Sequence, residues 1–227
     1  MFNKRLREYI NKNIELYNEY EQNFLEGLDL NYLKRYKKNM PDIFRQILEE
    51  IGYYEDCIEE SGYQAFIDLL DNEFGLENNI IEVGGGVVPT LGHKISLRQN
   101  KGSITIYDPR LSDYFNESEK FVLKKEKFYR DTDVSEADVI IGFMPCEATQ
   151  SIIENAVDKN KDFMIALCEG GPHGDEFDYF EDEQEWLGAM LYIAERGLED
   201  NDMGDLKILS FKNYNSPYPI IYNKRNQ

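Results

Sequence analysis

The chain has 227 residues, of which 41% are hydrophobic and 13% aromatic, so it can form a packed core and is not a disordered segment. Its formal net charge is -19, from 44 Asp and Glu residues against 25 Lys and Arg residues. Proteins that bind nucleic acid usually present a basic face, and the one basic cluster, residues 34–38, is typical of a solvated helix face. We therefore expect no nucleic-acid partner.

The chain contains three cysteines, Cys57, Cys146 and Cys168, without the spacing of a metal site or a redox motif. This predicts reduced thiols and no bound metal. No apolar stretch approaches the roughly 20 residues needed to cross a bilayer, and the N-terminus lacks the apolar region of a signal peptide. We expect a cytoplasmic protein without a membrane partner.

Residues 1–76 are predicted to form a helical N-terminal segment, because Leu, Ile, Tyr and Phe recur there at helical spacing. One helix is expected to begin near Pro41, since proline is tolerated in the first helical turn. Another is expected to begin near Ser61. We interpret this segment as a lid over a site or as the surface of a homodimer.

Residues 77–227 show a different pattern, in which short apolar runs alternate with stretches of helical length. This alternation predicts a doubly wound α/β domain. The predicted strands cover residues 80–83, 103–108, 127–129, 138–143, 163–168, 206–211 and 218–224. The predicted crossover helices cover TLGHKISLRQ, SEKFVLKKE and ATQSIIENAVDKN, and the link between Tyr129 and Asp138 is too short for one.

The last two predicted strands are joined by a link of only six residues, Lys212 to Pro217, whereas a parallel crossover needs a dozen or more. We therefore predict a seven-stranded, mostly parallel sheet with an antiparallel last strand. Residues 163–205 are strongly acidic, with Arg196 as their one basic residue. This composition predicts an exposed, mobile loop after the fifth strand.

The sequence IIEVGGGVVPTLGHKI predicts a strand ending at Val83, a turn of three glycines, and a helix beginning near Pro89. Glycines at this point allow a ligand to approach the backbone beside the free N–H groups of a helix. Asp108, 22 residues after Gly86, ends the next strand, where a carboxylate can accept hydrogen bonds from both hydroxyls of a ribose. The alternatives are a tight turn without a ligand, and Asp108 as a turn residue.

This combination resembles the class I S-adenosylmethionine-dependent methyltransferases over about residues 78–227. In that resemblance Asp138 opens the fourth strand, Asp131 lies beside the adenine, and Val88 replaces the third glycine. The resemblance implies S-adenosylmethionine as the cofactor and a reversed last strand. The cofactor-binding residues that it implies are Glu82, Gly84, Gly85, Gly86, Asp108, Pro109, Asp131, Phe143, Met144 and Pro145.

A competing interpretation is an NAD-binding fold, because GGGVVP also approximates G-x-G-x-x-G, with Pro89 in place of the third glycine. Asp108 would serve either cofactor. A nicotinamide-binding sheet is wholly parallel in its usual form, so the predicted antiparallel strand favours the methyltransferase interpretation.

The candidate catalytic residues follow the predicted strands at the carboxyl edge of the sheet. The motif of methyltransferases that act on amino groups, Asn or Asp followed by two prolines and an aromatic residue, is matched in GFMPCEAT only at Pro145. Glu169 and His173 follow the fifth strand and are candidates for a base or an orienting group, or else are ordinary loop residues. The leading hypothesis is methyl transfer to a small-molecule acceptor. The alternatives are a non-catalytic nucleotide-binding module and an NAD-binding oxidoreductase.

Overall fold

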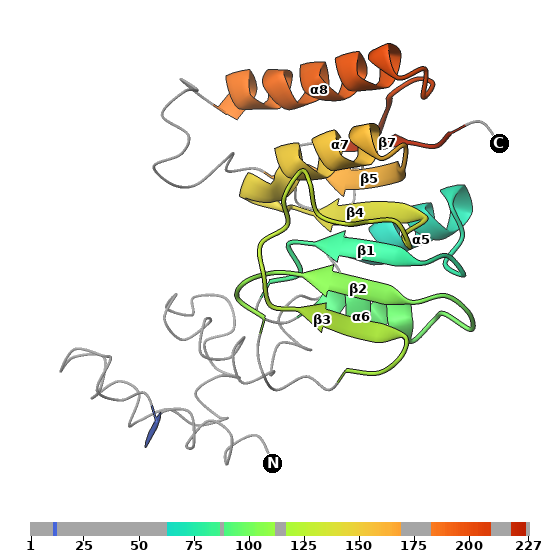
Figure 1. Cartoon of the computed structure of the whole chain (residues 1–227), viewed down its shortest axis with the longest axis vertical. Helices are drawn as coiled ribbons and strands as arrows, with labels where there is room; N and C mark the ends of the chain where they lie inside the picture. Colours follow the sequence, from blue (N-terminus) through green and yellow to red (C-terminus); the bar gives the residue numbers. More distant parts are fainter. Residues whose placement is uncertain are drawn as a thin grey trace. The chain divides into compact units, whose positions relative to one another are not determined.

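The computed structural model describes residues 11–12, 63–86, 89–111, 117–168, 183–209 and 219–225. Its described strands form a seven-stranded sheet with the order β3-β2-β1-β4-β5-β7-β6 (Figure 1). The strands are β1 (Ile80–Val83), β2 (Ile104–Tyr107), β3 (Phe121–Lys124), β4 (Val139–Phe143), β5 (Asp162–Ala166), β6 (Lys207–Leu209) and β7 (Ile220–Asn223).

The first five strands pair in parallel, and the last strand runs in the opposite direction. β7 is antiparallel to β5, with Ala166 opposite Ile220, and antiparallel to β6, with Leu209 opposite Ile220. β1, β4 and β5 are mostly apolar and largely buried on both faces, which is typical of parallel strands covered by helices. The predicted seven-stranded sheet with a reversed last strand is confirmed.

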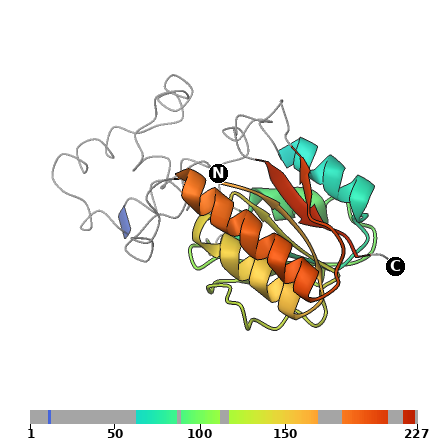
Figure 2. The ribbon, with the colours of Figure 1, turned by 90° about the horizontal axis from the view of Figure 1, so that it is seen from above.

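Helices cover both faces of this sheet. α7 (Thr149–Asp158) and α8 (Glu183–Asp200) lie on one face, and α5 (Tyr63–Glu73) and α6 (Thr90–Ser96) lie on the other (Figure 2). A short 3₁₀ turn, η3 (Cys146–Ala148), precedes α7. The predicted helices near Ser61, near Pro89 and over ATQSIIENAVDKN are therefore confirmed. Among the described helices, none is long and apolar enough to cross a membrane.

α5 is part of the sheet's own core. Phe66, Ile67 and Leu70 are fully buried and pack in one cluster with Ile80 and Ile104. Burial of each side chain of this size contributes about 1.5–3 kcal/mol. The compact unit that holds the sheet spans Glu60–Leu111 and Glu117–Gln227, whereas the predicted boundary follows residue 76.

The rest of the predicted N-terminal segment, including the helix near Pro41 and the suggested lid or homodimer surface, lies outside the described residues. The basic cluster at residues 34–38 does so as well. These interpretations remain predictions.

The third strand differs from its predicted position. β3 is FVLK at 121–124, paired with β2, so the predicted strand at 127–129 and the predicted helix over SEKFVLKKE are both wrong. Charged residues flank β3 because it is the edge strand, where charges prevent pairing with another sheet. Phe128, placed by the prediction in a strand, instead packs its ring edge-to-face on Tyr107 at 5.4 Å. The link 125–138 from β3 to β4 contains no helix.

Residues 183–200 form a helix where the sequence suggested an acidic, mobile loop. Trp186, Met190, Ala194 and Leu198 recur every fourth residue and are buried in the core cluster that α7 shares. The acidic composition reflects the outer face of α8 and does not prevent helix formation. Residues 169–182 of the expected loop lie outside the described residues.

Candidate functional site

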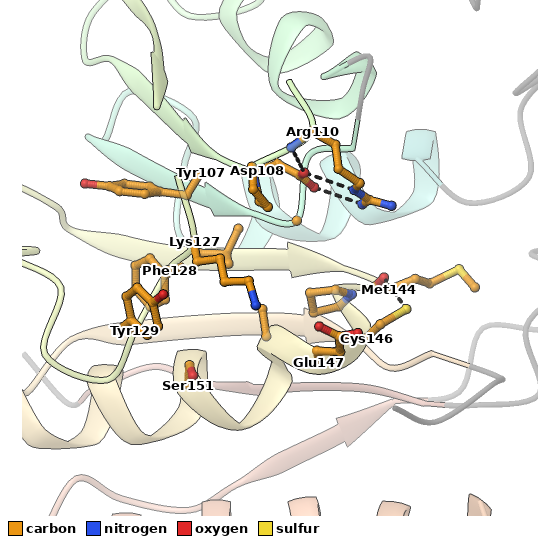
Figure 3. Close-up of a pocket in the computed structure, with 15 residues that line it drawn as sticks. Tyr107, Asp108, Arg110, Lys127, Phe128, Tyr129, Met144, Cys146, Glu147 and Ser151 are labelled. Atoms are coloured by element: carbon orange, nitrogen blue, oxygen red, sulfur yellow. Dashed lines mark hydrogen bonds and ion pairs between the residues drawn. The ribbon is translucent and has the colours of Figure 1, made fainter. Parts of the chain in front are cut away.

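A pocket of about 530 Å³ opens at the carboxyl edge of β1, β2 and β4 (Figure 3). The strand order changes direction between β1 and β4, and open α/β sheets bind ligands at this kind of switch point. The pocket is lined by Val83, Gly84, Tyr107, Asp108, Pro109, Arg110, Lys127, Phe128, Tyr129, Met144, Pro145, Cys146, Glu147, Ala148 and Ser151.

Asp108 is a buried carboxylate in the wall of this pocket, with 3% of its surface exposed. Its Oδ2 accepts the backbone N–H of Gly86 at 2.9 Å, and its Oδ1 accepts the backbone N–H of Arg110 at 2.8 Å. The Arg110 guanidinium adds two hydrogen bonds, from Nε to Oδ1 at 3.1 Å and from Nη2 to Oδ2 at 2.9 Å. Four hydrogen bonds therefore converge on this carboxylate, two of them from the charged guanidinium.

The three glycines of the loop after β1 have different structural roles. Gly84 has a φ of 78°, and a Cβ there would lie 3.0 Å from Cα of Pro145, so the loops after β1 and β4 meet closely at the pocket wall. Gly85 does not line the pocket, and a Cβ on it would lie 2.5 Å from Cγ2 of Ile106. Gly86 has a φ of 74° and contributes its N–H to Asp108. Of the three, Gly84 alone lines the pocket.

Glu82 lies on the opposite face of β1 from the pocket side chains, beneath α6. A Cβ on Gly92 would lie 2.3 Å from Oε2 of Glu82, so the glycine makes room for the acid. Burial raises the pKa of Glu82 to about 8, the nearby Asp108 carboxylate acts in the same direction, and the N–H of Gly92 opposes them. Oε2 accepts no hydrogen bond from the described residues. Glu82 is therefore largely protonated at neutral pH and is placed as a core residue.

The loop after β4 carries Met144 and Pro145 to the pocket. Met144 and Cys146 have φ values of 53° and 47°, a left-handed conformation that is uncommon outside glycine. Phe143 does not line the pocket, because its ring packs against α5, 4.7 Å from the ring of Tyr63.

Cys146 also lines the pocket. Its Sγ lies 3.1 Å from Sγ of Cys168, a residue that follows β5 and is buried. The hydrogen bond to Cys168 and burial raise the pKa of the Cys146 thiol. The thiol is consequently neutral at neutral pH and acts as a donor.

The link after β3 forms another part of the wall, through Lys127, Phe128 and Tyr129. The prediction missed their role because it placed a strand over them. Asp131, expected beside the adenine, is exposed and does not line the pocket. Its neighbour Arg130 is turned to α7, where Nε binds Oδ2 of Asp158 at 2.6 Å.

The charged side chains that line the described pocket are two cations and two acids: Arg110, Lys127, Asp108 and Glu147. Figure 3 shows the Lys127 amine extending across the pocket toward the loop after β4. Within the described ranges, no group of three or more His, Cys, Asp or Glu side chains is arranged to hold a metal ion. The two catalytic candidates, Glu169 and His173, lie outside the described residues. The described walls thus supply groups for binding a polar ligand.

No protein-family model matches the chain, and no curated protein matches it. Solved structures do match. Human N-acetylserotonin methyltransferase, crystallised with S-adenosylmethionine, is 13% identical over 98% of this chain and 67% of its own, with a TM-score of 0.51.

Two further matches have lower TM-scores. Aeropyrum pernix fibrillarin, crystallised with S-adenosylmethionine, is 14% identical over 72% of this chain and 76% of its own, with a TM-score of 0.47. Synechocystis magnesium protoporphyrin IX methyltransferase is 13% identical over 88% of this chain and 99% of its own, also with a TM-score of 0.47. The sheet order, the reversed β7 and the match to the human enzyme lead to one conclusion: the chain has the fold of the class I S-adenosylmethionine-dependent methyltransferases.

Proposed function

We propose that this protein binds S-adenosylmethionine in the described pocket and transfers its methyl group to a small-molecule acceptor. The observation that carries the proposal is the buried carboxylate of Asp108, which faces the pocket at the end of β2 beside the glycine loop. Its two oxygens are suited to accept hydrogen bonds from the two hydroxyls of a ribose. The fold, and the S-adenosylmethionine bound to the human structural neighbour, support this choice of ligand.

The shape of the pocket also fits a nucleoside-containing ligand. Its volume of about 530 Å³ lies within the range of small-molecule sites, about 300–1,000 Å³. Gly84 has no side chain where the loop after β1 approaches Pro145 in the loop after β4, so only backbone atoms of Gly84 face the ligand there. Phe128 and Tyr129 supply apolar surface for a purine ring, and we assign the adenine side of the pocket to them rather than to the exposed Asp131.

An NAD-binding oxidoreductase is the less favoured alternative, because β7 runs antiparallel to its neighbours. When bound, S-adenosylmethionine supplies an electrophilic methyl group for an in-line displacement. The protein's contribution to such a transfer is to hold the two reactants in line and to exclude water. Lys127 and Glu147 line the same pocket and are placed to orient an acceptor. Glu169 and His173 remain candidates for a base.

We assign a small-molecule acceptor rather than DNA or RNA because the chain is acidic, with a net charge of -19. Among the described residues, Glu195, Glu199 and Asp200 are exposed on α8. A phosphate backbone would meet repulsion rather than the attraction that supplies most non-specific affinity. The test is a titration with tRNA and duplex DNA at low salt. Tight binding that weakens steeply with added salt would reverse the assignment.

The test of the cofactor is calorimetric titration with S-adenosylmethionine, S-adenosylhomocysteine and NAD. We expect the first two to bind and NAD to bind weakly or not at all. Asp108→Asn removes the charge and one acceptor and should weaken binding by roughly 10- to 100-fold, since a hydrogen bond to a charged group contributes about 1.5–3 kcal/mol. Asp131→Asn is the matched control and should leave the affinity unchanged.

The pattern of results separates the alternatives. Loss of affinity in Asp131→Asn but not in Asp108→Asn would show that the acid assigned to the ribose is the wrong one. Preferential binding of NAD would move the function to an oxidoreductase. Binding of S-adenosylmethionine without formation of S-adenosylhomocysteine across a panel of acceptors would favour the non-catalytic module. That outcome is compatible with the described pocket lining, whose carboxylates are those of Asp108 and Glu147.

A further inference from the structure

Two thiols meet in the wall of the pocket. Cys146 begins η3 after β4, and Cys168 follows β5, the neighbouring strand. The pairing of Phe143 with Ala166 brings the ends of these strands side by side. Sγ of Cys146 and Sγ of Cys168 are 3.1 Å apart. Cys146 lines the pocket, whereas Cys168 is only 6% exposed.

This arrangement differs from that of isolated structural cysteines. A disulfide has an S–S length of about 2.0 Å, so the two sulfurs need to approach by only about 1 Å to form one. Cys146 holds a left-handed backbone conformation, and its thiol also contacts the carbonyl oxygen of Met144 at 3.4 Å. The thiol therefore sits in a constrained loop and is directed at its partner. Such constrained conformations often mark functional positions.

We propose that Cys146 and Cys168 form a dithiol modification site, which a small peroxide entering through the pocket closes reversibly to a disulfide. The thiolate of Cys146 attacks the peroxide O–O bond, which yields a sulfenic acid and releases hydroxide. The thiolate of Cys168 then attacks the sulfur of Cys146 and displaces its hydroxyl group. In sum, two thiols and one hydrogen peroxide give one disulfide and two waters, and a dithiol reductant reverses the change.

The cross-link would tie the loop that carries Met144 and Pro145 to the end of β5, and so fix part of the pocket wall. The reaction requires a thiolate, and the pKa of Cys146 is raised by the contact with Cys168 and by burial. Closure should accordingly be faster at about pH 8.5 than at neutral pH. The inference concerns the two thiols and does not depend on methyl transfer.

The test is to treat the full-length protein with hydrogen peroxide at both pH values, alkylate the remaining thiols, and measure the intact mass and the peptide map. We expect loss of two hydrogens, two fewer alkylated thiols, and a peptide joining Cys146 to Cys168. Dithiothreitol should restore all three thiols. Cys57→Ser, which leaves the pair intact, should give the same cross-link.

Cys168→Ser provides the matched control, because Cys146 then lacks a partner and should proceed to a sulfinic acid that dithiothreitol does not reverse. Peroxide treatment of the wild-type protein that leaves both thiols open to alkylation would overturn the proposal. Sulfinic acid at Cys146 without a cross-linked peptide, or a cross-link to Cys57 instead, would also overturn it. If Cys57→Ser does not fold, the peptide map of the wild-type protein decides the question.

Discussion

Arg110 forms a bidentate ion pair with Asp108 at the mouth of the pocket, through Nε to Oδ1 at 3.1 Å and Nη2 to Oδ2 at 2.9 Å. The arginine side chain is 67% exposed, whereas that of Asp108 is 2% exposed. The guanidinium thus caps a buried charge from the solvent side. It occupies the carboxylate oxygens to which the proposed function assigns the ribose hydroxyls, so under that proposal the arginine and the ribose would compete for Asp108.

Replacement of Arg110 by Ala should have two opposite effects. The free protein should become less stable, because a buried carboxylate loses its charged partner. The affinity for S-adenosylhomocysteine should increase by roughly tenfold if breaking the ion pair costs about 1.4 kcal/mol of the binding free energy in the wild-type protein. Thermal unfolding without ligand and calorimetric titration measure the two effects on the same variant.

A ligand without ribose hydroxyls is the control for this competition. A dideoxyribose analogue of S-adenosylhomocysteine does not need the oxygens of Asp108, so Arg110→Ala should leave its affinity unchanged. Weaker binding of both ligands to Arg110→Ala would mean that the guanidinium contacts the ligand directly and does not compete with it.

The buried carboxyl group of Glu82 should make the free energy of unfolding depend on pH. Its pKa in the folded protein is about 8, above the ordinary value of 4.5, because the carboxyl group is buried. Between these two values the folded state keeps a proton that the unfolded chain has released, so the free energy of unfolding falls as pH rises. Glu82→Gln cannot ionise and should not show this loss.

The measurement is denaturant unfolding of wild-type and Glu82→Gln proteins at several pH values from about 5 to 8. The stability of the variant relative to wild type should increase across this range by a few kcal/mol, since one pKa unit corresponds to about 1.4 kcal/mol. A difference that stays constant with pH would show that Glu82 ionises normally in the folded protein.

Much of the site could be predicted from the sequence, because its backbone features leave local signals. The glycines after β1 and the acid after β2 mark the carboxyl edge of a parallel sheet, and the structure brings Gly84 and Asp108 together in one pocket. The short link before β7 fixed its direction by length alone. These signals depend on chain geometry and not on tertiary packing.

Side-chain direction and edge strands were harder to predict. Phe143 follows the alternation of β4 and shares the face of Ile141, so it meets α5 instead of the pocket. The strand FVLK is flanked by Lys and Glu, residues that are common on the exposed face of a helix. A sequence of this kind is therefore easily interpreted as a helix when its position at the edge of the sheet is not known. Trp186, Met190 and Leu198 recur at helical spacing in the sequence, but the prediction rested on the acidic composition and did not use this spacing.

Gly92 should be intolerant of even one added methyl group. A Cβ at this position would lie 2.3 Å from Oε2 of Glu82 and 2.4 Å from Cδ1 of Ile106. Overpacking of a buried site costs about 1–3 kcal/mol, so Gly92→Ala should lower the unfolding midpoint. Gly188 is the matched control: it lies within α8, and an added Cβ there would meet no atom within 4 Å apart from its chain neighbours and the backbone of its own helix.

Gly188→Ala should raise stability by about 0.5–1 kcal/mol, because alanine is the better helix former. Chemical denaturation of the two variants beside wild type gives both values. Equal effects at the two sites would contradict the close packing of Glu82 beneath α6.

Asn155 holds in place the helix-free link between β3 and β4. It is fully buried on α7, and its Nδ2 donates to the carbonyl oxygens of Tyr129 at 3.3 Å, Arg130 at 2.8 Å and Thr132 at 2.9 Å. The same link carries Phe128 and Tyr129 into the pocket wall. A single amide group therefore connects the stability of the link to the shape of the pocket.

Asn155→Ala should lower the free energy of unfolding by about 2–4 kcal/mol, because it leaves three partly buried carbonyl groups without their donor and opens a small cavity at a fully buried position. Asn155→Asp keeps the shape but turns carboxyl oxygens toward three carbonyl oxygens. The aspartate can donate only while protonated, so this variant should lose more stability at about pH 8 than at about pH 5, whereas the loss in Asn155→Ala should not depend on pH. Unfolding curves at both pH values, together with the affinity for S-adenosylhomocysteine, provide the measurement. Both variants should bind the ligand more weakly at temperatures where they remain folded. Wild-type affinity in a folded Asn155→Ala protein would show that the link does not shape the binding site.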